Sequence, residues 1–100
     1  MRVLVKAEAF ETITRNDEIM ALRAAFASKI QQIRGSGKLV EGGIFADDRG
    51  GAFILDVASH TELFDLLAPE IVDAMRVECR PLVSFDDLFD MFSKHGAGGS

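Results

Sequence analysis

Apolar and polar residues alternate through residues 2–10, which is the spacing of a β-strand with one buried face. One face carries Val3, Val5, Ala7 and Ala9, and the other carries Leu4, Lys6, Glu8 and Phe10. Because the second face holds two charged side chains, we do not expect it to be ordinary core.

From residue 16 the apolar residues recur every three or four positions, which predicts an amphipathic helix ending near residue 35. Asn16 is the expected N-cap, and acidic residues follow it at 17 and 18, where the helix dipole favours negative charge. Gly35 opens a Gly-Ser-Gly stop and can adopt the left-handed conformation that ends many helices. The apolar stripe consists of Ile19, Leu22, Phe26, Ile30 and Ile33.

The next two predicted strands form a hairpin over residues 38–46 and 52–57, separated by the turn sequence DDRGG at 47–51. The pair Gly42-Gly43 interrupts the first strand and indicates a bulge or a close approach of two backbones. The second strand is almost continuously apolar, apart from Asp56. That pattern is typical of a central strand buried on both faces.

A short helix and a fourth strand follow the hairpin. Ser59 and Glu62 form a capping box that predicts a helix start, and Pro69 ends or kinks that helix. Residues 73–80 alternate as a strand, and Pro81 can lie only at the end of a strand or in an edge strand. One of its faces carries Met75, Val77 and Cys79.

The last predicted element is a helix capped by Ser84. Its apolar stripe, which is too apolar to face water, consists of Phe85, Leu88, Phe89 and Phe92. We therefore expect the helix to pack at the sheet edge, over its own subunit or over a partner. Residues 96–100 are expected to form a flexible tail.

The order β-α-β-β-α-β followed by a C-terminal helix predicts a ferredoxin-like α+β fold. Its four strands would form an antiparallel sheet in the order fourth, first, third, second (4-1-3-2), with both main helices on one face. The helix-facing side would carry Val3, Val5, Ala7, Phe53, Leu55, Val57, Met75 and Val77. The other side would carry Leu4, Lys6, Glu8, Ile54, Asp56, Arg76 and Glu78.

Composition narrows the class of protein. The 100 residues, 48% hydrophobic and 27% charged, predict one globular domain over residues 1–95. With a net charge of −5 and no basic patch, nucleic acid is not an expected partner. No apolar run approaches the ~20 residues of a membrane span, so no membrane partner is expected. The single cysteine, Cys79, excludes an internal disulfide and suits a reducing cytoplasm.

The side of the sheet away from the helices carries the candidate chemistry. Glu8 and Glu78, with Asp56 nearby, are candidate acid–base groups, and Lys6 and Arg76 are candidate cations for a developing oxyanion. Two simpler interpretations stay open, a solvated sheet face and a ladder of charges inside an oligomer.

His60 would lie in the first turn of the second helix, as a base at a pocket mouth or as a surface histidine. No metal or cofactor is expected, because the cysteine and the two histidines lack the spacing of a metal site and the glycines lack that of a phosphate loop. Cys79 is expected on the core face as a buried, unreactive thiol.

Residues 51–67 (GAFILDVASHTELFDLL) combine a strand ending in Asp-Val with a Ser-capped short helix, and residues 75–83 (MRVECRPLV) resemble a last strand with a proline exit. In these features the chain resembles the dimeric α+β barrel superfamily, and within it the muconolactone isomerase-like proteins. The resemblance implies a homodimer, or a higher oligomer of dimers, in which two four-stranded sheets pack into a barrel. It also implies a small aromatic or lactone substrate and often no metal or organic cofactor.

Two hypotheses about function follow. The first is a non-catalytic domain that binds a small organic ligand or builds an oligomer. The alternative is a cofactor-independent enzyme, an isomerase, cyclase or monooxygenase that acts on a compact organic substrate. A closed apolar cavity with convergent polar groups would favour the enzyme hypothesis, whereas a sheet interface filled by side chains would favour the non-catalytic domain.

Overall fold

The computed structural model describes residues 1–95, so the expected tail at 96–100 lies outside the described residues. The elements follow the predicted order, with one additional short helix before the last strand. They are β1 (Arg2–Ala9), α1 (Asn16–Gly35), β2 (Leu39–Ile44), β3 (Gly50–Asp56), α2 (His60–Leu67), α3 (Glu70–Ala74), β4 (Met75–Leu82) and α4 (Phe85–His95).

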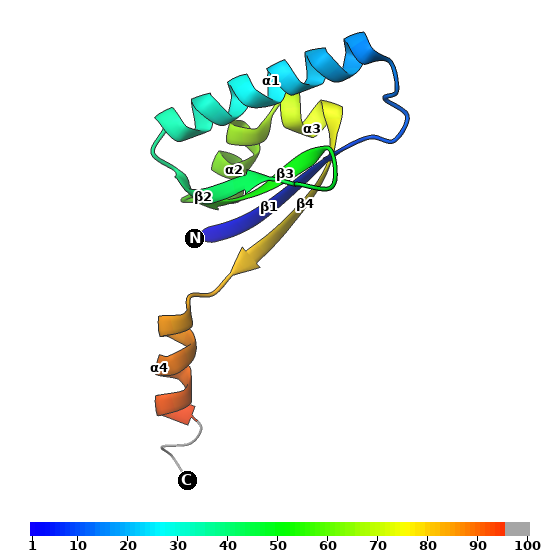
Figure 1. The fold of residues 1–100 in the computed structure, drawn as a ribbon. Helices are drawn as coiled ribbons and strands as arrows, with labels where there is room; N and C mark the ends of the chain where they lie inside the picture. The colour runs from blue at the N-terminus through cyan, green and yellow to red at the C-terminus, as the bar shows by residue number, and fades with distance from the viewer. Residues whose placement is uncertain (96–100) are drawn as a thin grey trace.

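The four strands form one antiparallel sheet in the order β2-β3-β1-β4. This order confirms the ferredoxin-like α+β fold with an extra C-terminal helix. Helices α1, α2 and α3 lie on one side of the sheet, and the other side has no helix over it (Figure 1). We call this uncovered side the open face.

The core lies between the sheet and the three helices. Val5 and Leu55 from the two central strands meet Ile33 of α1 and Ile71 of α3, and all four are fully buried. The predicted helix-facing residues are buried as expected, except Val77, which is half-buried. In the α1 stripe only Ile33 is fully buried, because the rest of the helix overhangs a groove described below.

Several local details differ from the sequence-based expectations. Asn16 is the first residue of α1 rather than its cap: Arg15 occupies the cap position, and its guanidinium pairs with Asp17 at 2.7 Å. Gly37, not Gly35, has the positive φ, at 78°. The bulge in β2 lies between Leu39 and Glu41, ahead of the glycine pair.

Other details are confirmed. Gly42 marks a close approach of two strands, because a Cβ added there would lie 2.5 Å from the Cβ of Phe53. The hydroxyls of Ser59 and Ser84 accept hydrogen bonds from the third following backbone N–H, at 3.1 Å each, and so cap α2 and α4.

Helix α4 projects away from the rest of the domain (Figure 1). The radius of gyration is 16.9 Å, against about 13 Å for a compact chain of this length. Its apolar side chains are largely exposed, with Phe85 78% and Phe89 60% accessible. Packing over its own subunit, one of the two expected arrangements, is therefore absent from the single chain.

Candidate functional site on the open face

The pairing of β1 with β4 brings four of the predicted site residues together on the open face. Lys6 of β1 lies opposite Glu78 of β4, and Glu8 lies opposite Arg76 one step along the same pair of strands. Successive side chains of a strand alternate between faces, so these four share one side. This arrangement confirms that they form one row, which we call the charged row.

Glu78 is the best-paired member of the charged row. Its carboxylate lies 3.8 Å from Lys6 Nζ and 3.2 Å from Arg80 Nη2. These side chains are 42–70% exposed, so each ion pair contributes no more than about 1 kcal/mol to folding. The strand alternation placed Arg80 on the same face as Glu78, but Arg80 was not among the predicted site residues.

Glu8 differs from Glu78 because it is half-buried and makes no ion pair within residues 1–95 at 4.0 Å or less. Its strand neighbours on the open face are Gly50 on β3 and Arg76 on β4. Glu8 is thus the one carboxylate of the row whose oxygens are not already shared with a cation.

The middle of the open face is apolar. Leu4 lies opposite Ile54 on β3, and Ala52 lies opposite Lys6. All three apolar side chains are half-buried, although no helix covers them. The sequence predicted that β3 would be covered on both faces, and this prediction is wrong for the single chain.

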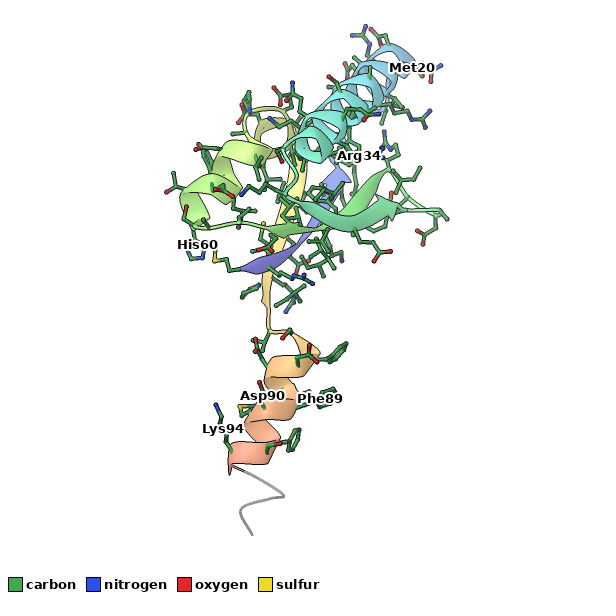
Figure 2. The ribbon with its side chains drawn as sticks, turned by 90° about the vertical axis from the view of Figure 1, so that its left-hand side faces the viewer. Met20, Arg34, His60, Phe89, Asp90 and Lys94 are labelled. Atoms are coloured by element: carbon green, nitrogen blue, oxygen red, sulfur yellow. The ribbon has the colours of Figure 1, made fainter. Side chains whose placement is uncertain are left out.

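The two remaining candidates, Asp56 and His60, do not join the charged row. Asp56 is six residues along β3 from the level of Glu8, about 20 Å away, and lies 3.4 Å from the N-terminal amino group. His60 is exposed at the start of α2, at the side of the domain (Figure 2). The expectation that Asp56 lies near both glutamates is therefore wrong.

Cys79 lies on the helix side of β4 but is exposed, contrary to the expected burial. The short helix α3 covers only the beginning of β4, where Met75 is buried, and leaves residues from 79 onward uncovered. Partial burial still raises the pKa of the Cys79 thiol, because the thiolate is poorly hydrated there. The thiol is therefore accessible but not activated.

The hollows of the domain lie elsewhere, between α1 and the β2–β3 hairpin. Two adjoining hollows of about 470 and 570 Å³ share Phe26, Ile30 and Ile44 and form a single groove along α1. We call it the α1–β2 groove. Four residues of the α1 stripe, Ile19, Leu22, Phe26 and Ile30, line the groove and are only half-buried. The sequence predicted the stripe but not the hollow.

Residues 1–95 contain no group of three or more His, Cys, Asp or Glu side chains placed to hold a metal ion. Within the same residues, no helix combines the length and the apolar character needed to cross a membrane. Neither a scan against protein-family models nor a search of curated proteins finds a match for the chain.

Proposed function

We propose that the protein works as a homodimeric α+β barrel domain whose two subunits pack open face to open face. The observation that carries this proposal is β3, a central strand that is apolar on both sides and covered on only one. Leu4 and Ile54 lie at the centre of the uncovered side, where a second sheet would exclude water from them.

The charges of the open face also suit a second copy. Lys6, Arg76 and Arg80 are interspersed with Glu8 and Glu78, so the surface carries both signs and is complementary to itself. A two-fold interface pairs one patch with the same patch, so a patch that carries both signs avoids the repulsion that a patch of one sign would meet there.

The test is the mass of the particle after two apolar residues of the open face are replaced. The double variant Leu4→Glu with Ile54→Glu should be a monomer, because it places four carboxylates at the centre of the dimer. The matched control is Phe64→Glu, an exposed apolar residue on α2, which should leave the dimer intact. Light scattering with refractive-index detection suits a chain without Trp or Tyr. A wild-type mass of one chain at micromolar concentration contradicts the proposal.

The second candidate function is the cofactor-independent enzyme, favoured by the one unshared carboxylate, Glu8. In a closed dimer Glu8 would act as the base that removes a proton beside a lactone carbonyl, with Lys6 or Arg76 stabilising the oxyanion. Deuterium incorporation from D₂O into an unsaturated lactone, followed by NMR, tests this. Glu8→Gln should abolish the exchange and keep the dimer, whereas exchange that persists in Glu8→Gln rejects this role.

The partners of the proposed dimer are a second copy of the chain and, between the sheets, a small organic molecule. The proposed cellular setting is the cytoplasm, because the exposed thiol of Cys79 stays reduced there.

A further inference from the structure

Helix α4 is the most strongly amphipathic element of the chain, and the single chain gives its apolar side little to pack on. Phe85, Phe89 and Phe92 are 78, 60 and 56% exposed. Phe89 points to one side of the helix, and Asp90 and Lys94 point to the other (Figure 2). A face of this kind is typical of a helix that lies in an apolar groove of a partner.

The α1–β2 groove is a suitable receptor for such a helix. Its apolar lining includes Leu22, Phe26, Ile30, Leu39, Ile44 and Phe45. It follows α1 from residue 19 to residue 34, a rise of about 22 Å, whereas the 11 residues of α4 extend over about 16 Å. The groove is therefore long enough to hold the whole helix.

The charges at the groove complement those of α4. Arg23 and Arg34 lie 11 residues apart on α1, which places them on the same side of the helix at opposite ends of the groove, and Arg49 lines the hairpin side. Glu41 and Asp48 also line it, so the groove carries one net positive charge. Helix α4 carries three acidic residues, Asp86, Asp87 and Asp90, and one lysine, Lys94, so its acidic residues outnumber its basic one.

Helix α4 cannot reach the α1–β2 groove of its own subunit. β4 and β2 are opposite edges of the sheet, three strand spacings or about 14 Å apart. The one β4 residue that lines the groove, Met75, is at the start of that strand, about 23 Å from Leu82, where the chain leaves for α4. Only Val83 and Ser84 separate β4 from α4, and they extend the chain by at most about 11 Å. The occupant that the tether allows is a second copy.

We propose that α4 of each copy docks in the α1–β2 groove of the other copy, an exchange that rests on the face-to-face dimer proposed above. When the two-fold axis runs along the strands, β4 of one copy lies over β2 of the other, and α4 then begins beside the receiving groove. The flat footprint of the sheet is roughly 450 Å² per copy, whereas a stable interface takes about 800 Å² from each partner. The exchanged helices supply the missing area.

The decisive experiment reverses the charges on each side separately. One variant carries Arg23→Glu with Arg34→Glu in the groove, and the other carries Asp86→Lys with Asp90→Lys on α4. Each variant alone juxtaposes like charges, so its dimer dissociation constant should rise at least about tenfold over the wild type. Mixed in equal amounts, the two variants should form a heterodimer of near wild-type affinity, because both mismatched surfaces then meet their complements. Sedimentation velocity measures the dissociation constant of each variant and of the mixture.

The matched control reverses two exposed acidic residues outside the groove, Asp65→Lys with Asp73→Lys, and should not change the dissociation constant. If the dimer dissociation constant is unchanged in both charge variants, the docking of α4 in the groove is wrong. If both variants dimerise more weakly and their mixture does not regain the wild-type affinity, the exchange between copies is wrong. Sedimentation of a monomeric wild type with phosphatidylcholine vesicles would mean that α4 binds a membrane instead.

The same measurements separate the two proposals. If Leu4→Glu with Ile54→Glu dissociates the dimer and the charge variants do not, only the helix exchange is wrong. If the charge variants show loss and rescue while the sheet variant stays dimeric, only the face-to-face packing is wrong. A wild-type protein that stays monomeric at high micromolar concentration overturns both.

Discussion

Lys29 is the one buried charged side chain within residues 1–94, and replacing it with methionine should destabilise the domain. Its ammonium group donates to the carbonyl oxygen of Ala68 at 2.7 Å and lies 3.0 Å from Glu70 Oε2. These contacts join α1 to the turn between α2 and α3. Methionine keeps the length and packing of the chain but leaves the Ala68 carbonyl without this donor.

The expected loss of folding stability follows from the Ala68 carbonyl, which is left without the Lys29 donor. A part-buried polar group deprived of its partner costs about 1–3 kcal/mol, which is a large share of the stability of a small domain. For a domain of this size each kcal/mol lowers the melting temperature by about 4–8 °C. Urea unfolding followed by far-UV circular dichroism measures the change, since the chain has no Trp or Tyr for fluorescence.

Lys38→Met is the matched control for Lys29→Met. Lys38 pairs with Glu62 at 3.4 Å, but its side chain is 42% exposed, so water replaces the lost partner. Its replacement should change the free energy of unfolding by less than about 1 kcal/mol. Equal losses in Lys38→Met and Lys29→Met would refute the reasoning that burial makes the Lys29 contact important.

Three further predictions concern the same domain. The hydrogen bond from Lys29 lowers the pKa of Glu70. The ionised carboxylate therefore stabilises the fold above the ordinary carboxyl pKa, and this contribution is lost as the pH falls through the lowered pKa. Urea unfolding at several pH values should show that Glu70→Gln is less stable than the wild type at neutral pH and equal to it in strong acid. Gly42→Ala should cost about 1–3 kcal/mol in urea unfolding because the added Cβ meets Phe53, whereas Gly43→Ala, with open space, should not destabilise. Phe89→Ser with Phe92→Ser should halve the particle mass in light scattering and leave the melting temperature of the dilute monomer unchanged; a lower monomer melting temperature would mean that α4 packs in cis.

The fold follows from the sequence because its signals are local and strong. The period-two spacing of residues 2–10, the capping serines 59 and 84, and the apolar stripe of α1 each identify an element without knowledge of the rest of the chain. The element order then leaves few ways to build a sheet. The short helix α3 was missed because five residues before a strand carry no clear helical period.

The candidate site was only partly predictable, because alternation along a strand tells which face a residue occupies but not how far along the sheet it lies. Lys6, Glu8, Arg76 and Glu78 were placed together correctly because β1 pairs with β4 along its full length. Asp56 shares their face yet lies at the far end, which only the register of β1 with β3 reveals. Lys29 was missed for a related reason: its burial depends on the Ala68 carbonyl, 39 residues away in the chain.

The two proposed contacts depend on each other, so the proposal predicts that they form and separate together. The open face alone gives each copy a footprint smaller than a stable interface takes, and α4 alone is an 11-residue helix, a length at which isolated helices are marginal in water. Docking in the groove would order α4 and add its apolar area to that of the sheets. Each contact thus raises the effective concentration of the other, so weakening either one should release both. This coupling predicts that the dimer of the charge-reversal variants dissociates in a single transition on dilution, without an intermediate in which only the helices have separated.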